Sequence, residues 1–321
     1  MLYVFRRTAS NGAREVVEAL QEAGVNARRL NDLARAHFGQ GVRNGDHVIC
    51  WGEAATVPAG VLTLNNVPVI GKFEEAQRLA AAGVPTITVS RTRQNTAPLP
   101  PVPVDRFPAE AARIQEVVRE FVDANWVRGP VFRDAAGLAL REINTLLQLN
   151  GQAVPVTPPA PVVQWVGRRN NHTGGADLLR PPTTPDFYVQ RLNITEEYRV
   201  HSFLGRSIRA GVKRHRPDFR GTRSEWIRSF DAGWFIDYAN FESTEQMREM
   251  ARNACNALGL QFGAVDIGRT ATGLIVLEVN RAPGVEGGTS TAYATNIQRW
   301  MNGELNAATG ASGRTRRTRA A

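Results

Sequence analysis

The order of apolar and polar positions along the first part of the chain predicts a small α/β domain. A short apolar run at 2–4 predicts a strand, and from about 12 to 23 apolar residues recur every three to four positions, which predicts a helix. Ser10 or Asn11 can cap this helix, and Gly24 can end it. A strand followed by a helix is the first half of a unit that builds a parallel sheet.

The same alternation continues to about residue 90. Strands are expected at 26–30 and 47–51, a helix at 72–82 and a further strand at 86–90. The run HVICW at 47–51 is apolar throughout, as in a parallel strand buried on both faces. We therefore predict an N-terminal α/β domain with a parallel sheet over residues 1–70.

Prolines divide the next part of the chain. Residues 91–108 are rich in proline and predict a linker or surface loop, and helices are expected at 109–125 and 135–149. Residues 71–160 are therefore interpreted as a central region with a helical insertion. Residues 161–303 hold the candidate chemistry, and 304–321 form an arginine-rich tail that we expect to be disordered.

The most informative segment predicts an antiparallel hairpin. Residues 262–267 and 274–279 are rich in β-formers, and 269–273 has turn chemistry. Glu278 and Asn280 are two residues apart and project from the same face of their strand. If the hairpin is symmetric about Thr272, Asp266 lies directly opposite Glu278.

Two carboxylates that face each other across strands repel, so one should take up a proton unless a cation lies between them. Carboxylate and amide oxygens are ligands that Mg²⁺ accepts, above all where substrate phosphates complete the shell. The alternative is an exposed hairpin face with ordinary charges. The strongly apolar flanks of the segment favour the metal site.

Composition indicates the class of protein and the compartment in which it acts. The chain has 42% hydrophobic and 21% charged residues, as in an ordinary globular protein. No run is long enough for a membrane helix, and the N-terminal apolar run is too short for a signal peptide, so we expect a cytoplasmic protein with no membrane partner. Cys50 and Cys255 lie far apart and are interpreted as buried free thiols.

The net charge is +9, and the cations are arginines except for Lys72 and Lys213. Part of this charge lies in the tail, which could contact nucleic acid or could be a solvated segment with no specific partner. The basic balance also favours anionic substrates, because a positive field raises their rate of encounter.

An ordered set of motifs resembles the ATP-grasp superfamily, which includes the D-alanine–D-alanine ligases and the ribosomal-protein glutamate ligases. In chain order they are GRRNNHTGGADL, EEYRVHSFLG, VDIG and LEVNRAPG, and the resemblance covers roughly 72–300. It implies an ATP-grasp fold, in which two α+β subdomains behind the N-terminal α/β domain clamp ATP. Short stand-alone proteins of this type are also encoded by phages.

The resemblance assigns Asp266, Glu278 and Asn280 to two Mg²⁺ ions, with Mn²⁺ as an alternative ion. Many members of the superfamily have an arginine two residues before the aspartate, where this chain has Ala264. We expect Arg281 or Arg228 to supply the missing charge.

The resemblance also implies a nucleotide site. It assigns the first nucleotide lysine, two arginines in place of a second lysine, a glycine-rich loop over the triphosphate, a hinge beside the adenine and a carboxylate on the ribose. These are, in the same order, Lys72; Arg168 and Arg169; Gly174 and Gly175; Gln190, Arg191 and Leu192; and Glu197, which is favoured over its neighbour Glu196.

Lys213 resembles the lysine that reaches the transferred phosphate, and Arg228 and Arg281 are the other candidate catalytic residues. Arg199 and His201 are interpreted either as substrate contacts or as structural residues. The implied activity is ATP-dependent ligation of a carboxylate, from an amino acid, acidic peptide or protein, to an amine through an acylphosphate. The alternative is an inactive nucleotide-binding protein, or a nucleic-acid- or virion-associated protein, on the same scaffold.

Overall fold

The described part of the chain forms one compact unit with three β-sheets. The computed structural model describes residues 1–36, 40–92, 165–170, 184–221 and 227–305. All of them belong to the unit made by Met1–Arg93 and Trp165–Ala321. The helices expected at 109–125 and 135–149, and the tail after residue 305, lie outside the described residues.

The first sheet is the parallel sheet that the sequence predicts. Its strand order is β2–β1–β3–β4, and every pair in it is parallel. Ser10 caps the helix that follows the first strand, because its Oγ accepts a hydrogen bond from the N–H of Ala13 at 3.3 Å. The elements are β1 (Leu2–Phe5), α1 (Asn11–Glu22), β2 (Ala27–Leu30), β3 (His47–Cys50) and β4 (Leu62–Leu64), of which β4 was not predicted.

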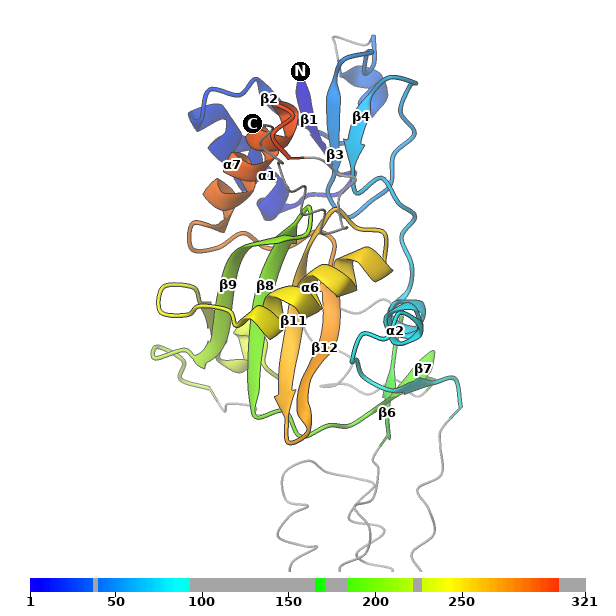
Figure 1. Ribbon diagram of the computed structural model, residues 1–321, viewed down its shortest axis with the longest axis vertical. Coiled ribbons are helices and arrows are strands. Elements are labelled where there is room, and N and C mark those ends of the chain that lie inside the picture. The colour runs from blue at the N-terminus through cyan, green and yellow to red at the C-terminus, as the bar shows by residue number, and fades with distance from the viewer. Residues whose placement is uncertain (37–39, 93–164, 171–183, 222–226, 306–321) are drawn as a thin grey trace, which may run out of the picture. The chain divides into compact units, whose positions relative to one another are not determined.

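The last helix of the described chain, α7 (Thr289–Met301), returns to this N-terminal domain and packs beside α1 (Figure 1). Leu20 of α1 and Ile297 of α7 share a buried cluster with Phe203 and Phe262, which come from the central sheet. Each such buried side chain contributes about 1.5–3 kcal/mol of transfer free energy. The two ends of the described chain are thus joined through one core.

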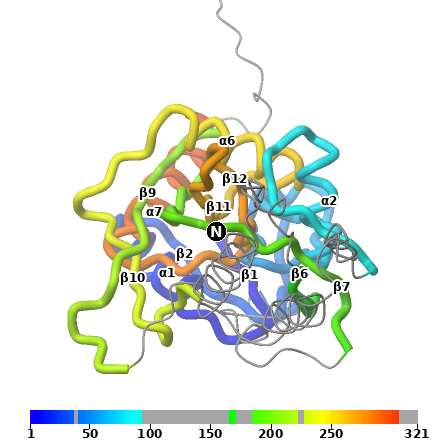
Figure 2. The backbone as a smooth tube through the Cα atoms, turned by 90° about the horizontal axis from the view of Figure 1, so that it is seen from below, coloured from blue at the N-terminus to red at the C-terminus, as the bar shows by residue number. Residues whose placement is uncertain are grey.

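The central sheet is antiparallel, with five strands in the order β10–β9–β8–β11–β12. Helix α6 (Glu245–Ala257) lies across one face of it (Figures 1 and 2) and packs on Val200, Val265 and Val276. Because side chains alternate along a strand, the residues between these positions project from the opposite face. The strands are β8 (Glu196–Phe203), β9 (Arg206–His215), β10 (Trp234–Asp237), β11 (Phe262–Thr270) and β12 (Gly273–Asn280).

A small antiparallel sheet, in the order β5–β7–β6, lies with helix α2 (Lys72–Ala81). Phe73 of α2 packs on Phe187 of this sheet, with ring centroids 5.8 Å apart. The strands are β5 (Val89–Ser90), β6 (Trp165–Arg168) and β7 (Phe187–Gln190).

The strand predicted at 86–90 is therefore shorter than expected. Thr86 pairs instead with Val276 of β12, and the Val276 N–H donates to the carbonyl of Pro85 at 2.7 Å. The segment changes from one sheet to the other within a few residues, and this ties the small sheet to the edge of the central one.

Both cysteines are buried free thiols, as predicted, and burial raises the pKa of Cys50 and of Cys255 to about 12. No helix in the described part of the chain is both long and apolar enough to cross a membrane.

Candidate active site

The β11–β12 hairpin places Asp266 directly opposite Glu278, which confirms the predicted pairing. The turn is tighter than predicted, because Thr270 pairs with Gly273 and only two residues lie between them. A turn of this size alone would not bring the two carboxylates together.

A β-bulge corrects the register. Near the turn Ile267 pairs with Val276, whereas one step further Asp266 pairs with Glu278, so Leu277 is the extra residue. Without it, continuing the register of the turn would place Asp266 opposite Leu277. The bulge therefore sets the carboxylate pair, in keeping with the use of bulges to re-aim side chains at functional sites.

Asp266 is held by Arg199, which lies opposite it on the neighbouring strand β8. The guanidinium binds both carboxylate oxygens, with Nε at 2.7 Å from Oδ1 and Nη2 at 2.8 Å from Oδ2. Asp266 is only 3% exposed, so the pair lies in a medium where such a two-point contact is strong. Burial acts to lower the pKa of Arg199, but Asp266 raises it above its usual value.

Glu278 has a different cation. The Nζ of Lys72, the first residue of α2, lies 2.9 Å from Oε2 of Glu278. Burial acts to raise the pKa of Glu278, but Lys72, Arg199 and Asn280 together bring it down to about 2. A proton is expected on one carboxylate of the pair only where no cation lies between them, and Lys72 supplies a cation directly beside Glu278.

Asn280 lies between the two carboxylates. Its Nδ2 donates to Oε1 of Glu278 at 3.0 Å and to Oδ2 of Asp266 at 3.3 Å. The three side chains that we assign to metal binding thus converge on one point, and the amide N–H group bridges the two acceptors. For Asn280 to be a metal ligand its amide would have to turn its oxygen inward.

The oxygen atoms of Asp266, Glu278 and Asn280 suit a metal ion whose remaining coordination positions are filled by a bound substrate. Among the described residues no group of three or more His, Cys, Asp or Glu side chains is placed to hold an ion. Two carboxylates and an amide fit Mg²⁺ in the manner in which it is bound with substrate phosphates, rather than in an all-protein cage.

A third ion pair lies on the same face, next to Arg199 and Asp266. Lys213 of β9 is hydrogen bonded through Nζ to Oε1 of Glu197 on β8, and both side chains are largely buried. Burial raises the pKa of Glu197, and Asp266 adds to this effect, whereas Lys213 and Arg228 oppose it. Arg228 is anchored by a hydrogen bond from Nη2 to the carbonyl of Ile194 at 2.8 Å.

Glu197 differs sharply from its neighbour. The Glu196 side chain is 46% exposed and pairs with Arg269 on the outside of the sheet, whereas that of Glu197 is 12% exposed. The structure therefore places the favoured glutamate, and not Glu196, beside Lys213. Its role toward a ribose stays a prediction.

The remaining nucleotide candidates lie around the small sheet. Gln190 ends β7, where its N–H donates to the carbonyl of Thr88 at 2.9 Å, and Arg191 and Leu192 follow in the connection to β8. Arg168 ends β6 and Arg169 comes directly after it. Gly174 and Gly175 lie outside the described residues.

Arg281 does not supply the charge missing at Ala264. Its Nη1 and Nη2 atoms donate to the carbonyls of Pro68 and Val67, each at 2.7 Å, so the guanidinium anchors the segment before α2. Arg199 occupies the position beside Asp266 that the sequence analysis left to Arg281 or Arg228. These contacts give no support to a catalytic role for Arg281.

His201 is a structural residue. It is completely buried, with Nδ1 at 3.2 Å from the hydroxyl of Tyr293 and Nε2 at 3.0 Å from that of Tyr238. Burial, with Arg199 and Arg209, lowers the pKa of His201 to about 3. A neutral ring with both nitrogens occupied is not placed to contact a substrate.

The sequence analysis missed Glu75. This residue of α2 is 6% exposed, and its Oε1 accepts a hydrogen bond from the N–H of Val279 at 2.9 Å. The signal was present, since Glu75 lies four residues before Leu79 on the apolar side of the helix, where a glutamate needs a specific reason.

No protein-family model matches this chain. A stretch of 46 residues, 14% of this chain, is 50% identical to a probable alpha-L-glutamate ligase of Xanthomonas euvesicatoria pv. vesicatoria. A stretch of 44 residues is 52% identical to the protein of that name in Coxiella burnetii. The matches span 16% and 15% of the length of these relatives.

Two solved structures resemble most of the chain. The ATP-grasp ligase PsnB, in complex with its minimal precursor, gives a TM-score of 0.51 at 13% identity, covering 92% of this chain and 98% of PsnB. The D-alanine–D-alanine ligase of Bacillus anthracis gives 0.50 at 13% identity, covering 95% and 96%. The chain therefore has the ATP-grasp fold, as the resemblance implied.

Proposed function

We propose that this protein is an ATP-dependent ligase that joins a carboxylate to an amine. The observation that carries the proposal is the cluster of Asp266, Glu278 and Asn280 on one hairpin face, with Lys72 and Arg199 directed onto its two carboxylates. The ATP-grasp fold and the local identity to glutamate ligases support it. PsnB has also been solved with Mg and ADP.

The reaction would take place in two steps. A carboxylate oxygen of the substrate attacks the γ-phosphorus of ATP, which forms an acylphosphate and releases ADP. The amine nitrogen then attacks the acyl carbon, phosphate leaves, and the nitrogen loses a proton as the C–N bond forms. No residue of the protein needs to be covalently modified.

The residues of the site act mainly through charge. Lys72, Lys213, Arg199 and Arg228 make this face suited to a polyanion, because preorganised cations stabilise the charge that develops on a transferring phosphoryl group. Bound Mg²⁺, held by Asp266, Glu278 and Asn280 with phosphate oxygens, would supply further charge neutralisation. Glu197 would hold the ribose, and Gln190, Arg191 and Leu192 would lie beside the adenine.

The substrates proposed first are amino acids or peptides. The named relatives are probable alpha-L-glutamate ligases, PsnB was solved with a minimal precursor, and the Bacillus protein is a D-alanine–D-alanine ligase. The excess of positive charge on this chain favours an acidic carboxylate donor.

The decisive experiment is calorimetric titration of ATP with Mg²⁺ into wild type and into the Asp266→Asn, Glu278→Gln double variant. We expect metal-dependent binding by wild type and its loss in the double variant, followed by ADP release when the correct carboxylate and amine are supplied. The control is Glu196→Gln, which removes an exposed carboxylate from the same sheet.

Equal ATP binding by the double variant would contradict the proposed site. Metal-dependent ATP binding without ADP release, across a broad panel of carboxylates and amines, would favour an inactive nucleotide-binding protein on this fold.

A further inference from the structure

Helix α2 holds strand β12 with two side chains that lie one turn apart. Lys72 binds the side chain of Glu278, and Glu75 binds the backbone N–H of Val279. Strand β12 is at the edge of the central sheet, so this N–H has no neighbouring strand to pair with. Glu75 takes the place of that strand, directly between the metal candidates Glu278 and Asn280.

A hydrogen bond to one N–H does not require a charged, buried carboxylate. An isolated charge is costly to bury and persists in proteins where a partner compensates it. Burial raises the pKa of Glu75, and the group that opposes this most strongly is Lys72. Glu75 and Lys72 lie three residues apart on α2, so their side chains are neighbours on the helix surface even though the ammonium is hydrogen bonded to Glu278.

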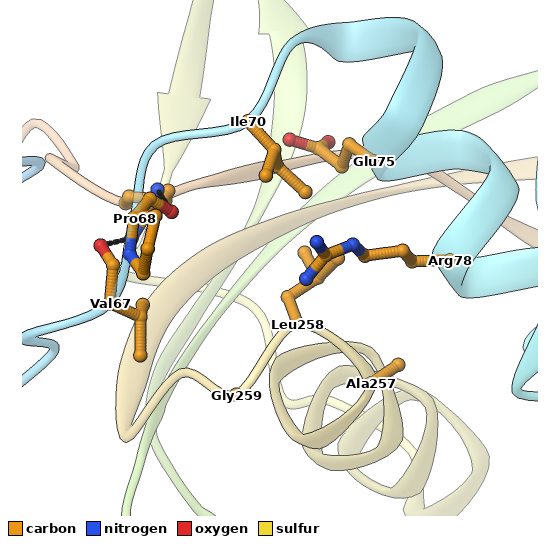
Figure 3. Close-up of a pocket in the computed structure, with 9 residues that line it drawn as sticks. Val67, Pro68, Ile70, Glu75, Arg78, Ala257, Leu258 and Gly259 are labelled. Carbon is orange, nitrogen blue, oxygen red and sulfur yellow. Dashed lines mark hydrogen bonds between the residues drawn. The ribbon is translucent and has the colours of Figure 1, made fainter.

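The surroundings of Glu75 include polar groups as well as apolar ones. It lies in the wall of a cavity of about 220 Å³ between α2, the segment 67–70 and the end of α6 (Figure 3). Arg78 and Arg281 also line this cavity. A space of this size with several polar groups can hold water.

Metal binding at Glu278 would displace the ammonium group of Lys72 from its carboxylate partner. A divalent cation and the ammonium would compete for the same carboxylate and repel each other. When no nucleotide is bound, a partly buried Lys72 that loses Glu278 would have no hydrogen-bonded anionic partner, which is unfavourable. Glu75 lies three residues further along the same helix, and residues at this spacing are neighbours on a helix surface.

We propose that Glu75 is a positioning residue that serves as the second partner of Lys72: in the absence of nucleotide it pairs with the Lys72 ammonium when a divalent cation binds Glu278, and it keeps β12 in place. This inference rests on the proposed function, since it assumes that Glu278 is a metal ligand. It predicts that metal binding breaks the ion pair of Lys72 with Glu278 and forms an ion pair of Lys72 with Glu75.

The test is a double-mutant cycle in which Mn²⁺ affinity is measured by electron paramagnetic resonance in the absence of nucleotide. Glu75→Gln keeps an oxygen acceptor for Val279 but removes the charge, so we expect it to weaken Mn²⁺ binding about tenfold, within the range of coupling between neighbouring groups. In the Lys72→Met background the same substitution should change the affinity less than about twofold, because no ammonium then needs a second partner.

The matched control is Glu74→Gln. Glu74 is in the same helical turn, but it is exposed and pairs with Arg78, so its loss should leave Mn²⁺ affinity unchanged. An equal loss on Glu75→Gln with and without Lys72 would overturn the inference, because Glu75 would then act only through its general negative field.

A second measurement does not depend on metal binding. In a crystal structure of Glu278→Gln we expect the Nζ of Lys72 within hydrogen-bonding distance of the Glu75 carboxylate. If Lys72 points away from Glu75 in that structure, the inference is overturned, but the proposed function is not. If wild type binds no Mn²⁺ in the absence of nucleotide, this inference fails, whereas the proposed metal site is judged separately by Mg²⁺-dependent ATP binding, in which the phosphates complete the metal shell.

Discussion

The Nζ of Lys72 lies 2.9 Å from Oε2 of Glu278, although 206 positions separate the two residues in the sequence. The contact joins the first turn of α2 to the edge strand of the central sheet. It also explains how two carboxylates can face each other on β11 and β12, since Arg199 pairs with Asp266 while Lys72 pairs with Glu278.

The ion pair of Lys72 and Glu278 should make the protein lose stability in acid. The pKa of Glu278 is lowered from 4.5 to about 2 in the folded state, so its contribution is complete above pH 4.5 and is lost as the pH falls toward 2. We expect Lys72→Met to reduce this dependence, because the folded-state pKa of Glu278 would then rise. Urea unfolding at a series of pH values measures the slope, and an unchanged slope in the variant would contradict the assignment.

The bidentate pair of Arg199 and Asp266 should matter more for stability than any exposed ion pair. Removing one partner of a buried pair leaves the other charge uncompensated, so Arg199→Ala should lower the free energy of unfolding by about 3 kcal/mol. Arg252→Ala, which breaks an exposed pair with Glu249, should cost about 0.5 kcal/mol or less. Chemical denaturation of both variants decides the matter, and similar losses would mean that the Arg199 pair is not effectively buried.

His201 should contribute a separate pH dependence. Its pKa is lowered from 6.5 to about 3, so the unfolded chain binds a proton in this window while the folded protein does not. Stability should therefore fall as the pH drops from 6.5 toward 3, and His201→Gln should show a smaller slope there. The comparison uses thermal or urea unfolding, and an equal slope would show that His201 is protonated in the folded state.

The sequence was sufficient for features that depend on neighbouring residues. The parallel order at the N-terminus follows from apolar runs and one helix, and two β-rich runs around a turn were enough to predict that Asp266 faces Glu278. That pairing came from assuming a turn centred on Thr272, whereas the structure reaches it through a bulge at Leu277. A bulge depends on how the strand packs and has no simple signal in one sequence.

Contacts between distant segments could not be predicted in this way. Periodicity shows which side of α2 is buried, but it does not show that Lys72 and Glu75 contact residues of β12. It likewise gave no means to choose Arg199 over Arg281 as the partner of Asp266, because that choice depends on which strand pairs with β11. Such choices are made by tertiary packing.

Glu197 and Glu196 offer a direct test of the nucleotide site. If Glu197 and its partner Lys213 bind ATP, Glu197→Gln should weaken ATP affinity by about 10- to 100-fold, the range for a hydrogen bond to a charged group. Glu196→Gln should leave the affinity within about twofold, because its side chain is nearly half exposed and pairs with Arg269. Calorimetric titration with Mg²⁺ present measures both, and equal effects would argue against a ribose contact at Glu197.

The segment that follows β12 is in close contact with the N-terminal helix α1, which gives a test of the packing between them. A Cβ added at Gly12 of α1 would lie 2.5 Å from the carbonyl oxygen of Pro283, a backbone atom that cannot move aside alone. Gly12→Ala should therefore lower the free energy of unfolding by about 1–3 kcal/mol, as overpacking does. Gly284→Ala is the control, since a Cβ there meets nothing within 4 Å and should be nearly neutral. Because Pro283 follows Asn280 by three residues, the Gly12 variant should also weaken ATP binding with Mg²⁺ if the shift reaches the hairpin. Equal stability of the two variants would mean that α1 and the segment that follows β12 are not in the close contact described here.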